Sequence, residues 1–290
     1  MLKKTLAGFF LVLFAESAFG GQTLSPLTEA ILSNKLAAVQ ARLSLGDDVR
    51  SAADGFVPVI MAVNADTRIL KLILDAGADP NQRNSQGGTA LASAAGCRPS
   101  IYVRLLKSGG YKEKPPDCEE DVRLLIQAHA DVNLPGDFRR TPLDWAVEEG
   151  NEKIVRILLE AGASTEIRNW VDETPLMTAL SAYMDEKSRT QASFGPQMPI
   201  IKLLLQYHAN TNIEFGGRYD EYQESRRWPY ASGYTPLTLA ARHCWVSVAK
   251  MLLAAGADRS IARSDGETAL DIARERRCKP VQAVLQDHKR

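Results

Sequence analysis

The sequence predicts an all-α solenoid of stacked helix-turn-helix units joined by short hairpin loops. The first observation is residues 141–173, where Thr-Pro-Leu opens one short amphipathic segment and a second follows Gly150. Proline suits a first helical turn because its φ is already helical, and the apolar residues of the second segment recur at helical spacing. The other two observations are the recurrence of this start at a period of 33 residues and of a small-residue closing turn. Two short helices cannot bury their apolar faces alone, so each unit needs neighbours.

Seven starts divide the chain into units. Thr-Pro-Leu or a variant of it occurs near residues 25, 57, 89, 141, 174, 235 and 268. Closing turns related to Ala-Gly-Ala-Asp occur at 45–48, 76–79, 128–131, 161–164, 207–210 and 255–258. This period, start and turn resemble the ankyrin repeat, and the resemblance covers residues 25–290. It implies a row of hairpin tips and first helices that binds other proteins.

The chain departs from the ankyrin pattern at two positions. The histidine that follows Thr-Pro-Leu in the family is replaced here by Thr28, Asp144, Met177, Thr238 or Asp271. His129 and His208 replace the glycine of two closing turns, which is tolerable because histidine visits the left-handed region more often than most residues.

Inserts near 108–119, 184–198 and 216–233 lengthen two of the units. The third unit has 52 residues and carries Val-Arg-Leu-Leu twice, at 103–106 and at 122–125. One copy belongs to the regular second helix and the other to an extra helix. The sequence leaves open which is which.

The first 20 residues have the features of a signal peptide. A basic start at Lys3 and Lys4 precedes an apolar run over 6–15, and small residues flank a cut after Gly20. We therefore expect an exported mature domain of residues 21–290, with an uncleaved anchor as the alternative. The short leader and the absence of an Asn-x-Ser/Thr site favour a bacterial, periplasmic protein.

The composition argues against several classes of function. Lys plus Arg and Asp plus Glu both number 35, so the net charge is zero. Phosphate binding needs a basic excess, so nucleic acid and anionic membranes are not expected partners. No nucleophile elbow, metal helix or phosphate-binding loop occurs. We expect neither an enzyme nor a cofactor.

The four cysteines are expected to form disulfides, because an even count in an exported chain favours pairing. Cys97 and Cys118 each precede one copy of the duplicated helix, so a bridge would clamp the two copies together. Cys244 and Cys278 occupy nearly equivalent turns of adjacent repeats, and their bridge requires those turns to lean together. The alternative is a zinc site formed by His243, Cys244 and Cys278.

The hairpin tips are the first candidate for partner binding. Trp170 stands where the other repeats carry a polar residue, so we interpret it as a binding residue, with packing onto the neighbouring hairpin as the alternative. We expect Trp145 to be a core residue and Trp245 to cover Cys244. The predicted tips are Asn84-Ser85-Gln86, Asp137-Phe138-Arg139, Asn169-Trp170-Val171 and Ser264-Asp265.

The 216–233 insert is the second candidate, because aromatic residues and arginine are enriched where interfaces carry energy. Its candidate residues are Arg218, Tyr219, Tyr222, Arg226, Arg227, Trp228 and Tyr230. The alternative is a self-packed lid over the concave face. We expect a monomer that binds a protein partner, which is either a resident of the envelope or an incoming toxin that the chain inhibits. A periplasmic enzyme or metal-binding protein is a further alternative.

Overall fold

The structure is a computed structural model that describes residues 24–52, 56–63, 65–97, 117–181, 197–214 and 233–287. The leader, the first copy of the duplicated helix and the seven candidate residues of the 216–233 insert lie outside these ranges.

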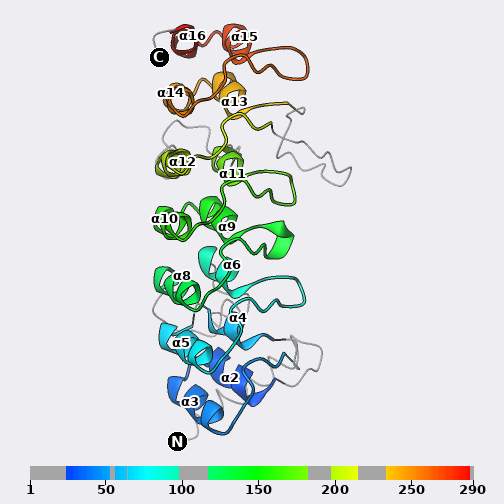
Figure 1. The fold of residues 1–290 in the computed structure, drawn as a ribbon, viewed down its shortest axis with the longest axis vertical. Coiled ribbons are helices and arrows are strands. Elements are labelled where there is room, and N and C mark those ends of the chain that lie inside the picture. Colours follow the sequence, from blue (N-terminus) through cyan, green and yellow to red (C-terminus); the bar gives the residue numbers. More distant parts are fainter. Residues whose placement is uncertain are drawn as a thin grey trace, which may run out of the picture.

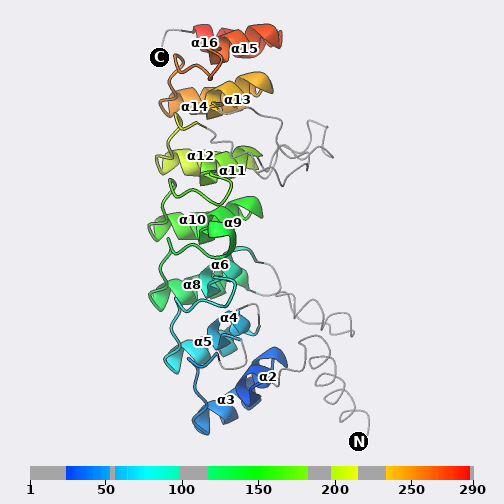
Figure 2. The same ribbon diagram turned by 90° about the vertical axis from the view of Figure 1, so that its right-hand side faces the viewer.

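The described helices form two parallel columns, as Figures 1 and 2 show. The first helices of the repeats are α2 (Pro26–Leu32), α4 (Pro58–Ala62), α6 (Ala90–Ala95), α9 (Pro142–Glu148), α11 (Pro175–Ser181), α13 (Pro236–Arg242) and α15 (Ala269–Glu275). The second helices are α3 (Leu36–Ser44), α5 (Thr67–Asp75), α8 (Cys118–Gln127), α10 (Glu152–Glu160), α12 (Gln197–Gln206), α14 (Val246–Ala254) and α16 (Lys279–Gln286). Within the described ranges no strand occurs, apart from a single bridge between Ala262 and Thr268. The predicted all-α solenoid is confirmed.

The first helices begin where the repeated starts predict. The threonine or serine of the start caps the helix in every case except α4, where Val57 provides no side-chain cap. The Thr141 hydroxyl accepts a hydrogen bond from the Asp144 N–H, and Pro142 fills the first turn. At the closing turns, His129 (φ 65°) and His208 (φ 60°) adopt the left-handed conformation that Gly162 (φ 88°) adopts in its own repeat. The two histidines thus replace glycine without changing the turn.

The structure decides which copy of the duplicated helix is regular. Helix α8 contains residues 122–125 and packs between α5 and α10 in the second-helix column. Val122 and Leu125 are completely buried there. The second copy is therefore the regular helix of the third repeat.

Asparagine side chains join the closing turns of neighbouring repeats. The Asn133 side chain accepts a hydrogen bond from the Ser164 N–H at 2.7 Å and donates one to the Gly162 carbonyl at 3.3 Å. Asn81 and Asn212 make the same pair of bonds to the turns that follow them. The Asp-x-Asn pattern at 79–81 and 131–133 is a sequence signal for this ladder.

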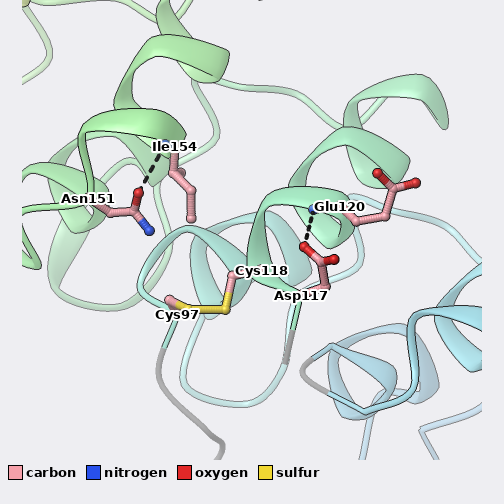
Figure 3. Close-up of a disulfide and its surroundings, with 6 residues drawn as sticks. All are labelled: Cys97, Asp117, Cys118, Glu120, Asn151 and Ile154. Atoms are coloured by element: carbon pink, nitrogen blue, oxygen red, sulfur yellow. Dashed lines mark hydrogen bonds between the residues drawn. A yellow bond between two sulfur atoms is a disulfide. The ribbon is translucent and has the colours of Figure 1, made fainter. Parts of the chain in front are cut away.

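Two disulfides brace the irregular part of the stack and its C-terminal end. Cys97 pairs with Cys118, with 5.5 Å between their Cα atoms, and the bridge joins the end of α6 to the start of α8 (Figure 3). Cys244 pairs with Cys278 at 5.7 Å, across the last two repeats. These are the pairings that the repeat positions favour. Since both thiols are in the bridge, the His243, Cys244 and Cys278 zinc site is not formed.

The hairpins project from the first-helix column along one side of the solenoid (Figure 1). We call four of them fingers, and they consist of residues 84–88, 136–140, 169–173 and 263–267. Each of the four fingers is closed by a hydrogen bond from the N–H of its first residue to the carbonyl oxygen of its last. The bonds run from Asn84 to Gly88, from Gly136 to Arg140, from Asn169 to Glu173 and from Arg263 to Glu267.

Candidate protein-binding site

Two aromatic side chains meet at the tips of the 136–140 and 169–173 fingers. The Trp170 N–H donates a hydrogen bond of 3.1 Å to the Phe138 carbonyl oxygen. The ring centroids lie 6.1 Å apart with the planes tilted by 47°, an arrangement that aromatic pairs favour. Phe138 is 64% exposed and Trp170 37% exposed. Trp170 therefore packs on the neighbouring finger, as the alternative interpretation held, and still presents part of its indole to solvent.

The backbone of the 136–140 finger is held in an unfavourable conformation. Arg139 has φ 52° at the position that is also left-handed in the other fingers, where Gly87, Asp172 and Gly266 stand. Phe138 adds a second left-handed residue, with φ 56° and ψ 28°. This conformation costs a non-glycine residue about 1–2 kcal/mol. Such outliers persist where the surroundings hold them, and they cluster at functional sites.

Arg140 connects the finger to helix α9. Its guanidinium lies 4.8 Å from the centroid of the Trp145 ring and forms ion pairs with Glu148 and, at 3.6 Å, with Asp144. Trp145 packs against the core but is only half-buried, and the Arg140 guanidinium lies over its ring. Our expectation of a core residue is corrected accordingly: Trp145 lies at the edge of the core.

Asp144, on helix α9, contacts both fingers. The residue is 1% exposed, and its carboxylate accepts hydrogen bonds from the Thr178 hydroxyl at 2.6 Å and from the Asn169 amide at 3.1 Å. Burial raises the pKa of Asp144, while the two hydrogen bonds and Arg140 act to lower it. Asn169 precedes Trp170, so this carboxylate holds both the finger of Phe138 and the finger of Trp170. The sequence marked Asp144 only as a departure from the family histidine.

The other predicted tips use their side chains within their own finger. The Asn84 side chain accepts from the N–H groups of Gln86 and Gly88, and Asp265 pairs with Arg263. One carboxylate oxygen of Asp137 is buried without a hydrogen-bond partner, and burial raises the pKa of Asp137. Neither ring of the exposed Phe138–Trp170 pair closes a hairpin in this way.

The described ends of the 216–233 insert lie against two fingers. Before the insert, the Arg168 guanidinium donates to the Glu214 carbonyl at 3.4 Å. After it, Gly233 lies so close to Ser264 that a Cβ atom would be 2.9 Å from the Ser264 nitrogen. Tyr234 is 2% exposed, and its hydroxyl accepts hydrogen bonds from Arg242 and Arg263. The insert thus leaves and rejoins the described structure on the finger side.

The turn around Cys244 contains a stacked pair of rings. Trp245 is 8% exposed and its ring centroid lies 4.8 Å from that of His243. Burial, with Arg242 and Arg276 nearby, lowers the pKa of His243 to about 4. The imidazole is therefore neutral at neutral pH. In the part of the chain that the structure describes, no group of three or more His, Cys, Asp or Glu is arranged to hold a metal ion.

The chain matches a family model described as ankyrin repeats (three copies) over residues 59–169 and 114–214, and a single ankyrin repeat over 232–263. The first model alone spans more than half of the chain. The chain belongs to the ankyrin-repeat family. Ankyrin-repeat domains are generally protein–protein interaction modules and are typically non-catalytic.

Relatives of this ankyrin-repeat protein differ greatly in length. The putative ankyrin repeat protein YahD of Escherichia coli is 29% identical over 217 residues, which cover 69% of this chain and 95% of YahD. The ankyrin repeat and KH domain-containing protein mask-1 of Caenorhabditis elegans is 28% identical over 73% of this chain, but the match spans only 8% of mask-1. A Xenopus tropicalis Notch homologue is likewise matched over only 5% of its length.

Solved structures show the same fold. The ankyrin repeat domain of Bcl-3, a member of the IkappaB protein family, superposes with a TM-score of 0.66 at 22% identity, covering 91% of this chain and 99% of that domain. The human ASB11 ankyrin repeat domain gives a TM-score of 0.58 at 22% identity, with 91% and 98% coverage. None of the helices in the described ranges has the length and apolar character that a membrane crossing requires.

Proposed function

We propose that this chain is an exported, periplasmic binding module that holds a protein partner on the 136–140 and 169–173 fingers. The single observation that carries the proposal is the exposed Phe138–Trp170 pair. Four large hydrophobic side chains are exposed in the described ranges, namely Leu45, Phe138, Trp170 and Tyr207. Two of the four lie in contact on adjacent fingers, where an ankyrin-repeat protein presents its loops.

The rigidity of the pair supports a binding role. Ordering a side chain on binding costs about 0.5–1.5 kcal/mol for each immobilised group. The hydrogen bond between Trp170 and Phe138 and the Asp144 carboxylate fix the fingers before a partner arrives. A partner that buries the two rings then loses little affinity to ordering them.

The insert extends the proposed surface. Arg168, beside the 169–173 finger, contacts the chain just before the insert, and Gly233 rejoins the structure at the 263–267 finger. The chain before the insert therefore lies beside the 169–173 finger of the proposed site, and the chain after it lies beside the 263–267 finger. Their aromatic and arginine residues would add contacts to the same partner.

Affinity capture from the cell envelope tests the proposal. The mature protein 21–290 is compared with Trp170→Ala, with Phe138→Ala and with a variant whose 217–231 segment is replaced by a Gly-Ser link. Tyr207→Ala is the matched control, because Tyr207 is 39% exposed and lies at the end of α12 in the other column. We expect one partner to be retained by the parent and the control and to be lost with Trp170→Ala and Phe138→Ala.

Equal retention of the partner by Trp170→Ala and the parent would contradict the finger site. The identity of the captured protein separates a resident envelope protein from a delivered toxin that the chain inhibits. A toxin would be expected to lose its activity on stoichiometric mixing with the parent.

A further inference from the structure

We propose that the fingers recognise a protein segment in which an apolar side chain stands close to a carboxylate. This inference rests on the proposed binding function and names the chemistry of the partner. The apolar side chain would pack on Phe138 and Trp170, and the carboxylate would pair with Arg139.

Arg139 is the cation that this tip leaves available. Its side chain is exposed, and within the described residues no carboxylate or carbonyl partners its guanidinium. Neighbouring arginines are already engaged, since Arg140 pairs with Glu148 and Arg168 pairs with Asp172 at 2.7 Å. The pairing of those two arginines leaves Arg139 as the group that an incoming anion would meet.

The backbone gives an independent reason to assign Arg139 a role. Its left-handed position is occupied in the other fingers by Gly87, Asp172 and Gly266, which suit this conformation better than arginine does. The preceding Phe138 is also left-handed. Two consecutive residues thus adopt a conformation that their side chains disfavour. The Arg139 side chain forms no hydrogen bond or ion pair within the finger, so we assign it a role in contacting a partner outside the finger.

Asp137 does not neutralise this cation. Its carboxylate faces the 84–88 finger. A Cβ atom added to Gly88 would lie 2.9 Å from one of the carboxylate oxygens of Asp137. That oxygen is buried. The exposed surface of the 136–140 tip therefore consists of an aromatic ring and a positive charge.

A carboxylate fits this arrangement better than a phosphate chain. Nucleic-acid binding draws on many basic contacts along a surface, and this tip offers one free guanidinium beside two rings. An Arg–carboxylate pair can be bidentate. The rings would shield it from water, and this strengthens a charge pair.

A random dodecapeptide phage library is the probe. Selection on mature protein and, in parallel, on Trp170→Ala gives the peptides that depend on the fingers. We expect the enriched peptides to place Asp or Glu within a few residues of Leu, Phe or Trp. A synthetic consensus peptide is then measured against Arg139→Glu, with Arg123→Glu as the control because Arg123 is an exposed arginine on α8.

The expected result is a weakening of about tenfold with Arg139→Glu and no change with Arg123→Glu. Replacing the peptide carboxylate by lysine should restore binding to Arg139→Glu. Enriched peptides that are basic or purely apolar would overturn the inference, as would the absence of any peptide that distinguishes the parent from Trp170→Ala.

Peptide binding by these variants distinguishes failure of the carboxylate inference from failure of the finger site. If Phe138→Ala and Trp170→Ala abolish peptide binding while Arg139→Glu leaves it unchanged, the finger site stands and the carboxylate inference fails. If none of the three substitutions affects peptide binding, the finger site fails as well.

Discussion

The Trp170 N–H and the Phe138 carbonyl oxygen form a hydrogen bond of 3.1 Å that links the tips of two neighbouring fingers. Phe138 adopts a left-handed backbone conformation at this contact, and the two rings lie against each other. The exposed aromatic pair therefore depends on a conformation that phenylalanine disfavours.

Two substitutions of Phe138 distinguish the free-energy cost of its left-handed backbone from the contribution of its ring. Phe138→Gly and Phe138→Ala both remove the ring, but alanine keeps the left-handed penalty and glycine does not. We expect Phe138→Gly to be more stable than Phe138→Ala by about 1 kcal/mol in urea-induced unfolding. Both should lose the partner equally. Equal stabilities for the two variants would show that residue 138 is not strained.

Asp144→Asn tests the link below the fingers. The new amide would place a donor opposite the Asn169 amide and the Arg140 guanidinium, which now share one carboxylate oxygen. Leaving buried donors unsatisfied costs about 1–3 kcal/mol. We expect that loss of stability and faster hydrogen exchange of the Trp170 N–H.

Asp75→Asn is the control for this substitution, since Asp75 is exposed and, among the described residues, forms an ion pair with Lys71 alone. It should change stability by less than about 0.5 kcal/mol. An Asp144→Asn protein with unaltered exchange at Trp170 would exclude Asp144 as the residue that positions the fingers.

His243 gives the protein a defined dependence on pH. Its pKa is lowered from 6.5 to about 4 in the folded state, so the unfolded chain binds more protons between these values. Stability from this group is present above pH 6.5 and is lost as the pH falls toward 4. We expect His243→Gln to flatten this part of the urea-midpoint profile. An unchanged slope in His243→Gln would refute the assignment.

The Cys244–Cys278 bridge should stabilise only the end of the stack. It spans 34 residues, for which the loop-entropy model gives about 4 kcal/mol. Each repeat contacts only its neighbours, so the double substitution Cys244→Ser with Cys278→Ser should raise hydrogen exchange in α13–α16 and leave α9 and α10 protected. A uniform loss of protection along the chain would contradict this local role.

The sequence predicted the stack because every repeat meets the same packing requirement. Leu143, Leu176 and Leu237 follow the Thr-Pro start of their repeats and are all fully or almost fully buried. A periodic pattern of this kind needs no knowledge of distant contacts. The positions of the cysteines within the repeat likewise predicted the two disulfide pairings. The position of Trp170 within the repeat predicted that it lies at a hairpin tip.

The sequence could not predict the hydrogen bonds of Asp144 beside the fingers, because they join positions far apart in the chain. Asp144 contacts Asn169 and Thr178, which lie 25 and 34 residues away. Likewise, only the three-dimensional structure shows that Arg140 covers Trp145. Nor did either copy of Val-Arg-Leu-Leu carry a mark of its place, since both have the same residues.

Site-specific photo-crosslinking in cells tests the central claim most directly. A photoreactive p-benzoylphenylalanine replaces Trp170 in one protein and Tyr207 in another, because the two side chains are exposed to nearly the same extent, 37% and 39%. We predict a crosslink to one defined protein from position 170 and none from position 207. Crosslinks of equal yield from both positions, or from position 207 alone, would contradict partner binding by the fingers.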